Sequence, residues 1–370
     1  MTGEIAVIGA GNGGCAVAAD LTLRGHAVRL HNRSPERLAP IVERGGIELQ
    51  GVAGEGFARI EVITTDLEEA ISGCETIIVT TPTSALEHYA PALAPIVSDD
   101  QVVWLNPGHT GGALFFAREV ERLTGRTGLR LCETASLTYA SRMQGPAAVG
   151  VFKVSTNLLF AAFPAGRTDA LFDHVAALFP TIRKAGNVLQ TGLENLNAVE
   201  HPPQILCNAG WLEHTRGDYY FYFEGTTPSV ARVIAAVDRE RLALAAAAGV
   251  PTRGFVDSFF ELGFTSERAR DSQDVYRAMQ DSEPNRWIKG PASLDHRYVH
   301  EDVGWGLVPW IHLGRLLDVP TPAMSALASI ASIVNERDYL SDGLTLERMG
   351  LAGCRDGGDL REYVRLGARG

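Results

Sequence analysis

Apolar residues near the start of the chain fall in short continuous runs, separated by glycine, proline or polar residues. The first run is Ile5–Ile8, and further runs lie within residues 75–82, 101–108 and 129–136. Stretches with apolar residues at helical spacing lie between them. Continuous apolar runs of this length are typical of strands that are buried on both faces of a parallel sheet. The first part of the chain, residues 1–185, is therefore predicted to form an α/β domain with a doubly wound parallel sheet.

Helical periodicity dominates the rest of the chain. Residues 227–249 begin with Thr-Pro, repeat apolar side chains about every 3.6 residues and stop at a glycine. Residues 321–337 follow the same pattern. We predict that residues 186–370 form a second, all-α domain. A length of 370 residues also favours two domains, because it exceeds the usual size of one.

One segment of this second domain departs from the helical pattern. His201 stands directly before Pro202 and Pro203 in the otherwise apolar segment of residues 195–206. Proline lacks a backbone N–H and disfavours the helical conformation of the residue before it. We therefore expect the helix to break at His201. A polar side chain at such a break either has a function or caps a backbone carbonyl.

A glycine-rich turn follows the first apolar run. Residues 9–14 read Gly-Ala-Gly-Asn-Gly-Gly, and helix-favouring residues then lead to a second strand-like run, residues 26–32. A strand, glycines, a helix and a second strand within about 30 residues form the Rossmann dinucleotide fingerprint. Its glycines make the tight turn, let the backbone approach a pyrophosphate and let the helix pack on the strand, while free N–H groups at the helix N-terminus hold the phosphates. The predicted cofactor-binding residues here are Gly9, Gly11, Asn12, Gly13 and Gly14.

The residues after the second strand indicate which dinucleotide binds. NAD-binding domains place an acid there to bond the ribose 2′-hydroxyl, whereas this chain has Asn32, Arg33 and Ser34. Asparagine removes the charge that repels a 2′-phosphate, arginine pairs with the phosphate, and serine donates a further bond. We predict a preference for NADP(H), with NAD(H) bound through neutral contacts as the alternative. Because the carboxyl ends of parallel strands line the cofactor site, we also predict cofactor contacts from Thr81, Pro82 and Asn106.

Charge and composition limit the partners. The formal net charge of −11 argues against general binding of nucleic acid or of an anionic membrane surface. No apolar run is long enough to span a bilayer, and the chain shows no leader with a basic start and a cleavage site. The five cysteines have no paired spacing, which fits a reducing cytoplasm, and we expect each of them to be a buried small hydrophobe.

Hydride transfer to a carbonyl or imine also needs a proton donor, and His201 is the best candidate because histidine titrates near neutrality. A partner is suggested by residues 295–309, which crowd Arg297, Glu301 and Asp302 together. A carboxylate bonded to one ring nitrogen would set the tautomer, and an arginine would clamp a substrate carboxylate. The alternative is an exposed charged turn. We expect no metal site, because no HExxH or cysteine spacing is present.

The chain resembles the opine dehydrogenase family over nearly its whole length. The matching segments, in order, are "AVIGAGNGGCAVAADLTLRGH", "LNPGHTGGAL", "NAVEHPPQIL", "FYFEGTTPSVARV" and "RYVHEDVGWGLVP". The resemblance implies a Rossmann domain joined to an all-α domain. By matched position it also implies that His201 is the catalytic histidine, Asp302 its acidic partner and Arg297 the arginine that binds a substrate carboxylate. Arg142 falls where members also place a substrate-binding arginine, and Asn32 replaces the aspartate of NADH-using relatives.

The resemblance implies a reaction as well. An opine dehydrogenase condenses the amine of an amino acid with an α-keto acid and reduces the imine to a secondary-amine dicarboxylate. Two alternatives remain: reduction of a ketone or of a preformed imine in a biosynthetic pathway, and a cofactor-binding regulator without activity. The expected partners are thus small-molecule substrates. The long apolar helices further predict a homodimer.

Overall fold

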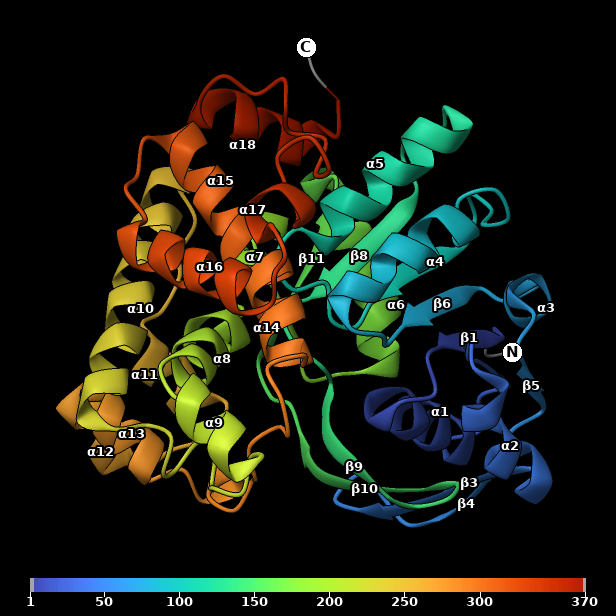
Figure 1. The fold of residues 1–370 in the computed structure, drawn as a ribbon. Helices are drawn as coiled ribbons and strands as arrows, with labels where there is room; N and C mark the ends of the chain where they lie inside the picture. The colour runs from blue at the N-terminus through green and yellow to red at the C-terminus, as the bar shows by residue number, and fades with distance from the viewer. Residues whose placement is uncertain (1–2, 369–370) are drawn as a thin grey trace. The chain divides into compact units, whose positions relative to one another are not determined.

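The computed structural model describes residues 3–368, which divide into two compact units. The first unit comprises the chain up to Gly108, Gly112–Thr191 and the end of the chain from Val364, and the second comprises His109–Gly111 and Gly192–Tyr363. The predicted fold class, a Rossmann-like α/β domain followed by a helical domain, is confirmed (Figure 1). The domain boundary predicted at residue 185 stays a prediction.

The first unit is built on an eight-stranded sheet with the order β12-β11-β8-β7-β6-β1-β2-β5. All neighbours are parallel except β8 and β11, so the sheet is mixed rather than wholly parallel as predicted. Its strands are β1 (Ile5–Ile8), β2 (Val28–His31), β5 (Val62–Thr64), β6 (Thr76–Val79), β7 (Val102–Leu105), β8 (Arg130–Thr134), β11 (Leu158–Phe163) and β12 (Ile182–Lys184).

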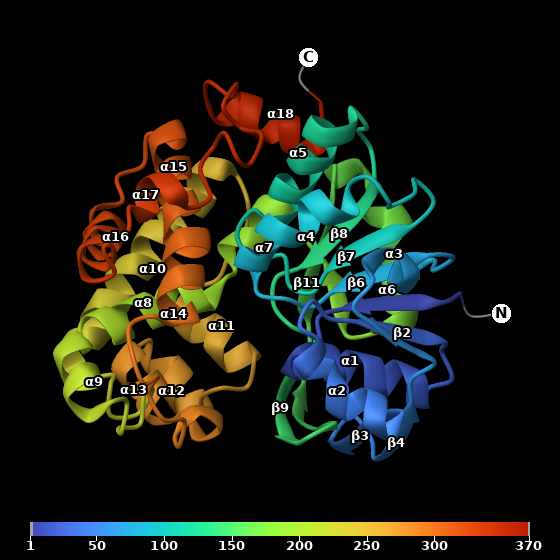
Figure 2. The ribbon, with the colours of Figure 1, turned by 45° about the vertical axis from the view of Figure 1, so that its right-hand side comes forward.

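Helices bury both faces of this sheet, which is why its strands are apolar without alternation. The helices and helical turns of the unit are α1 (Asn12–Leu23), α2 (Pro35–Arg44), α3 (Leu67–Ile71), η1 (Thr83–Ala85), α4 (Leu86–Leu93), α5 (Gly112–Thr124), η2 (Ala165–Arg167) and α6 (Thr168–Leu178). Figure 2 shows α4 and α5 beside the strands of the sheet. Every residue of β1, β6 and β7 is buried, as expected for strands covered on two sides.

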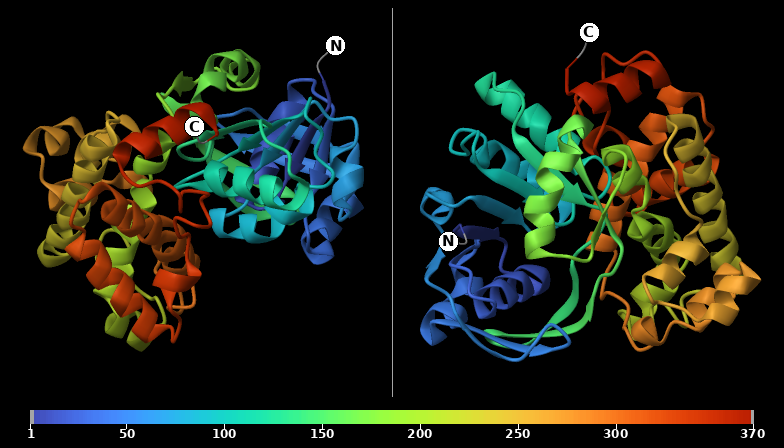
Figure 3. Two further views of the ribbon diagram at one scale, coloured as in Figure 1. Left: turned by 90° about the horizontal axis from the view of Figure 1, so that it is seen from above. Right: turned by 180° about the vertical axis from the view of Figure 1, so that it is seen from behind.

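A second, four-stranded sheet packs on the other side of α1 and was not predicted (Figures 1 and 3). Its order is β4-β3-β10-β9, and the strands are β3 (Gly46–Gly51), β4 (Gly56–Arg59), β9 (Tyr139–Gly145) and β10 (Ala148–Val154). The apolar side chains of this sheet and of α1 belong to one core with those of the main sheet. The helix of the glycine fingerprint is therefore held between two sheets.

The second unit is helical. Its elements are α8 (Leu196–Leu206), α9 (Ala209–Thr215), α10 (Pro228–Ala248), α11 (Phe255–Glu261), α12 (Glu267–Ser272), α13 (Val275–Gln280), η3 (Glu283–Asn285), α14 (Arg297–Asp302), the π-helix η4 (Val303–Leu307), α15 (Val308–Leu317), α16 (Pro322–Val334) and α17 (Tyr339–Asp342). The chain passes between the units within α7 (Val188–Leu193) and within α18 (Gly357–Leu366), and also on either side of the short segment His109–Gly111.

The long helix α10 has the ends that its sequence predicts. The Thr227 hydroxyl accepts from the Val230 N–H at the start, and Gly249 adopts a left-handed conformation at the end. Helices α8, α13, α15 and α16 pack around α10. This packing supplies the core of the second unit.

The expected break at His201 does not occur, because α8 continues through Pro202 and Pro203. A proline inside a helix costs about 3 kcal/mol. Ten of the eleven residues of α8 are buried, and the helix packs against α10, α14, α16 and η4. We infer that tertiary packing offsets the two missing backbone hydrogen bonds.

Two further expectations are tested here: that every cysteine is buried, and that no helix spans a membrane. Cys207 is exposed, against the expectation that every cysteine is buried, whereas the other four cysteines are buried and all five are free thiols. Cys207 follows α8 directly, beyond the buried part of the helix. Within residues 3–368, no helix has the length and apolar character needed to cross a bilayer.

A buried carboxyl caps the start of α5 in the first unit. Glu133 is fully buried and accepts hydrogen bonds from the Ala113 N–H, at 3.0 Å, and from the Thr191 hydroxyl. Burial raises the pKa of Glu133 to about 8, while the two hydrogen bonds act in the opposite direction. Because the pKa is higher in the folded protein than the ordinary 4.5, folding favours the protonated form.

We expect the contribution of Glu133 to the free energy of unfolding to fall as the pH rises from 4.5 to 8, because the unfolded chain releases the Glu133 proton first. Glu133→Gln should remove up to about 5 kcal/mol of this dependence, since each pH unit contributes about 1.4 kcal/mol. Urea unfolding at several pH values measures the slope. Glu43→Gln, which changes an exposed acid of the same unit, is the control and should keep the native slope. A native slope in Glu133→Gln would contradict the prediction.

Candidate functional site

The imidazole of His201 is enclosed on both edges and one face. Its Nδ1 lies 2.7 Å from Oδ2 of Asp302, and its Nε2 lies 2.8 Å from the Tyr222 hydroxyl. The Tyr298 ring stacks on it with 3.9 Å between centroids. His201 is 4% exposed and Asp302 is fully buried. In the neutral ring, Nδ1–H donates to the carboxylate, and Nε2 is then left to accept from Tyr222.

Three elements bring these side chains together. His201 lies on α8, Asp302 ends α14, and Tyr222 lies in the turns between α9 and α10. A side chain at Gly306 of the π-helix η4 would place its Cβ 2.6 Å from the Cβ of Ala198 on α8. Glycine at this position therefore allows η4, and with it the end of α14, to lie directly against α8.

A second carboxyl lies beside the ring. Oε1 of Glu200 is 3.9 Å from Nε2 of His201, and Glu200 is 5% exposed. Burial, and then the charge of Asp302, raise the pKa of Glu200 to about 8. Glu200 is therefore protonated at neutral pH. Among residues 3–368, neither Oε2 of Glu200 nor Oδ1 of Asp302 has a hydrogen-bond partner.

Arg297 pairs with Glu301 rather than with Asp302. Its Nε and Nη2 lie 2.9 and 2.7 Å from the same oxygen of Glu301, and its side chain is 46% exposed. The other oxygen of buried Glu301 lies 3.6 Å from Nδ1 of His109, a buried residue with a left-handed φ of 48°. Glu301 thus holds two of the three guanidinium nitrogens, Nε and Nη2, in place.

Arg142 belongs to the first unit and not to the unit that holds His201. It is exposed on the edge strand β9 and donates to the carbonyl of its neighbour Ser141. Its predicted contact with substrate stays a prediction.

The glycine turn of the first unit fits a dinucleotide pyrophosphate. Gly9 has φ 109°, and a Cβ at Gly14 would lie 1.7 Å from the Gly9 carbonyl oxygen, so both positions require glycine. A Cβ at Gly11, the N-cap of α1, would meet no atom within 4 Å, so the backbone is open to a ligand there. Asn12 accepts from the Met143 N–H, and Gly13 packs on Leu137.

Asn32 ties the end of β2 to the glycine turn. Its Oδ1 accepts from the Ala10 N–H at 3.1 Å, and its Nδ2 donates to the carbonyl of Ser34. Arg33 is exposed beside it, and the Ser34 side chain makes no capping bond to α2. The end of β2 therefore offers a cation and a hydroxyl without an acid.

The strand ends differ in what they can offer a cofactor. The hydroxyl of Thr81 is buried without a hydrogen-bond partner among residues 3–368, and Pro82 follows it. The amide of Asn106 is fully buried, donates to Thr138 and accepts from Thr134 and the Thr138 N–H. Since the Asn106 amide is already bonded within the unit, the orphaned Thr81 hydroxyl is the better supported contact. Cofactor contact by Asn106 stays a prediction.

Sequence reasoning missed several members of the cluster around His201. Tyr222 and Glu200 lie inside quoted motifs, "FYFEG" and "NAVEH", but nothing in their spacing assigned them a role. Tyr298 lies next to Arg297 and was not singled out either. Within residues 3–368, no group of three His, Cys, Asp or Glu side chains is arranged to hold a metal ion.

Comparison with family models gives two matches. Residues 184–335 match "NAD/NADP octopine/nopaline dehydrogenase, alpha-helical domain", and residues 5–108 match "Ketopantoate reductase PanE/ApbA". Among curated proteins, the opine dehydrogenase of Arthrobacter sp. (strain 1C) is 34% identical over 353 residues, which cover 95% of this chain and 96% of that protein.

Solved structures agree with this likeness. Octopine dehydrogenase with NADH and L-arginine superposes with a TM-score of 0.77 at 19% identity, covering 100% of this chain and 99% of that one. Yersinopine dehydrogenase with NADP⁺ superposes with a TM-score of 0.73 at 16% identity, covering 98% of each chain. These structures show the fold, and the identity to the Arthrobacter protein shows the family.

Proposed function

We propose that this chain condenses an amino acid with an α-keto acid and reduces the resulting imine. The chain belongs to the opine dehydrogenase family and is an NAD(P)-dependent dehydrogenase acting on CH–NH bonds. The observation that carries this proposal is the buried pair of His201 and Asp302, 2.7 Å apart. Condensation needs one group that removes a proton from the amine and delivers a proton to the departing oxygen. A histidine held in one tautomer by a carboxylate is suited to both steps.

Asp302 holds the ring in place and stabilises the imidazolium that forms when His201 accepts a proton. Arg297 anchors the carboxylate of the keto acid through its partly exposed guanidinium, while Glu301 keeps the guanidinium in position. Arg142 is the proposed site for a second substrate carboxylate. Anchoring the substrate raises the rate because it replaces an encounter in solution by a fixed geometry.

The proposed cofactor is NADPH. The turn at Gly9, Gly11 and Gly14 and the N-terminus of α1 hold the pyrophosphate, and Arg33 with Ser34 holds the 2′-phosphate. The buried hydroxyl of Thr81 donates to the cofactor. When bound, the cofactor supplies the hydride that reduces the imine carbon.

A second candidate function is reduction of a ketone or of a preformed imine. The match of residues 5–108 to the ketopantoate reductase model favours this candidate. A requirement for an amine substrate separates the two functions. Steady-state oxidation of NADPH across a panel of keto acids, with and without each amino acid, tests the proposal, and turnover that never depends on the amine would refute it.

A homodimer and a cytoplasmic location remain predictions. The exposed side chains of Ile330 and Ile333 on α16 support the homodimer, because exposed apolar side chains on one helix face are typical of subunit contacts.

For the cofactor, we expect NADPH to bind more tightly than NADH. Arg33→Ala should weaken NADPH by about tenfold or more and leave NADH nearly unchanged, because it removes the cation that pairs with the 2′-phosphate. Calorimetric titration of both cofactors measures this. Arg59→Ala, which removes another exposed arginine of the first unit, is the control. Equal or tighter binding of NADH by the native protein would show that the prediction is wrong.

For the acid–base pair, we expect His201→Ala to lower kcat by about a hundred- to ten-thousand-fold. Asp302→Asn should keep the fold but also lower kcat, because an amide does not hold the required tautomer or stabilise the imidazolium. Cofactor affinity should stay native in both variants, which serves as the control. A His201→Ala enzyme with most of the native kcat at neutral pH would reduce the histidine to a structural role.

For the substrate carboxylate, we expect Arg297→Lys to raise the KM of the keto acid more than it lowers kcat. Arginine bonds Glu301 through two nitrogens and has a third for the substrate carboxylate. Lysine has only one nitrogen, so it cannot make both contacts in this way. Initial-rate measurements with either substrate varied separate the two constants. An unchanged keto-acid KM would place the carboxylate elsewhere.

A further inference from the structure

We propose that the hydroxyl of Tyr222, rather than the imidazole itself, exchanges protons with the substrate, and that His201 and Asp302 act through it. The inference rests on the proposed function, since it concerns the proton transfers of the condensation.

Both ring nitrogens of His201 already have partners, so a proton that leaves Nε2 passes first to the Tyr222 hydroxyl. Nδ1 of His201 is bonded to Asp302 at 2.7 Å, and Nε2 is bonded to the Tyr222 hydroxyl at 2.8 Å. One ring face is covered by Tyr298, at an interplanar angle of 27°. A substrate that bonded Nε2 directly would have to displace Tyr222, which is itself buried. The hydroxyl has a further neighbour in the Tyr298 hydroxyl, at 3.3 Å.

Tyr222 transfers protons without becoming charged. Burial raises the pKa of Tyr222 well above its usual value, and Tyr298, Glu200 and Asp302 act in the same direction. A free tyrosinate is therefore disfavoured. A hydroxyl can accept one proton on its lone pair while it passes its own proton on, so the phenol stays neutral throughout.

The condensation balances with this relay. The substrate ammonium gives a proton to the Tyr222 oxygen as the Tyr222 proton moves to Nε2, which leaves a neutral amine and an imidazolium. The amine nitrogen forms its bond to the keto carbon, and one of its protons moves through the Tyr222 hydroxyl to the resulting alkoxide. The imidazolium then returns its proton through Tyr222 to the hydroxyl of the carbinolamine. The C–O bond breaks, and water and an iminium ion form.

Other ionisable groups face this relay and shape its pH dependence. Glu200 lies 3.9 Å from Nε2 on α8 and is neutral below about pH 8. On the segment of α14 and its N-cap, Asp302 bonds the ring and His296 lies edge-on to Tyr298, with 4.6 Å between centroids. Burial lowers the pKa of His296, and Arg297 and His201 add to the effect.

The test compares native enzyme with Tyr222→Phe. We expect kcat to fall by about tenfold to a hundredfold, with both substrate KM values nearly unchanged, because the relay acts in the proton transfers and not in binding. The native enzyme should show a solvent deuterium isotope effect on kcat whose dependence on deuterium content is curved, since two protons move together. The variant should lose this curvature.

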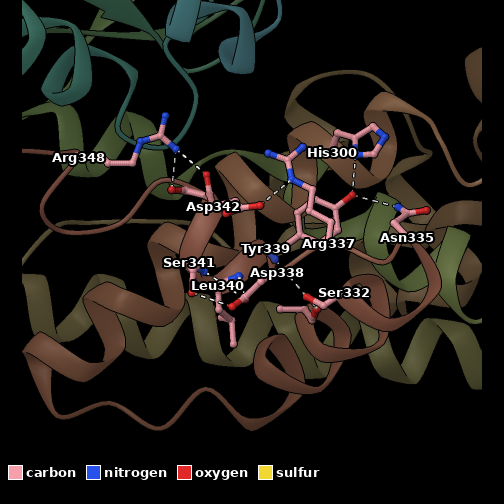
Figure 4. Close-up of polar contacts among 12 residues, drawn as sticks. His300, Ser332, Asn335, Arg337, Asp338, Tyr339, Leu340, Ser341, Asp342 and Arg348 are labelled. Atoms are coloured by element: carbon pink, nitrogen blue, oxygen red, sulfur yellow. Dashed lines mark hydrogen bonds and ion pairs between the residues drawn. The ribbon is translucent and has the colours of Figure 1, made fainter.

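Tyr339→Phe is the matched control. The Tyr339 hydroxyl also bonds a histidine ring nitrogen, Nδ1 of His300, at 2.5 Å, and it accepts from Asn335 at 3.0 Å (Figure 4). Tyr339 is buried to a similar degree as Tyr222. The control therefore removes the same kind of bond at another place in the second unit, and it should keep the native kcat and the curved isotope dependence.

A readout without substrate checks the contact itself. In protein labelled with ¹⁵N-histidine, Tyr222→Phe should shift the Nε2 resonance of His201 and leave that of Nδ1 nearly in place. A native kcat in Tyr222→Phe, or a linear isotope dependence in the native enzyme, would overturn the relay and leave the proposed function intact. Absence of any amine-dependent turnover in the native enzyme would instead overturn the proposed function and the relay with it.

Discussion

The bond between His201 and Asp302 is the interaction on which the candidate site in the second unit depends. Both side chains are removed from water, and a charge in such a place is tolerated only when a partner compensates it. Glu200 adds little charge to this cluster, because burial, and then the charge of Asp302, raise its pKa to about 8 and so favour its neutral form. The two bonded residues are 101 positions apart in the chain, so only the packing of α8 against α14 and η4 keeps them together.

Features that depend on near neighbours in the chain were predictable. The turn that begins at Gly9 needs glycine because the strand before it and the helix after it lie too close for side chains. The ends of α10 follow from the capping residues Thr227 and Gly249. The pairing of His201 with Asp302 required more than periodicity. The residues alone left Glu301 and Asp302 as equal candidates, and the family resemblance decided between them. The structure gives the two acids different partners, since Glu301 bonds Arg297.

Features that depend on distant partners were not predictable in the same way. Strand β3 pairs with β10, which lies about a hundred residues later in the chain. Neither segment has an apolar run clear enough to predict a second sheet. The continuity of α8 through Pro202 and Pro203 is of the same kind, because local propensity opposes it and surrounding helices overcome it. Tyr222 was missed since a tyrosine in a turn has no pattern that points to a histidine on another helix.

The close approach of Gly306 to Ala198 shows that the site depends on a residue without a β-carbon. Any β-carbon at position 306 would force η4 and α8 apart. The hydrogen bond between His201 and Asp302, now 2.7 Å long, would then be stretched and weakened. Substitution at this glycine should therefore disturb the alignment of His201 with Asp302, although it removes no group that takes part in the chemistry. Surveys that rank positions by the reactivity of their side chains will pass over Gly306, although the alignment of the acid with the base rests on it.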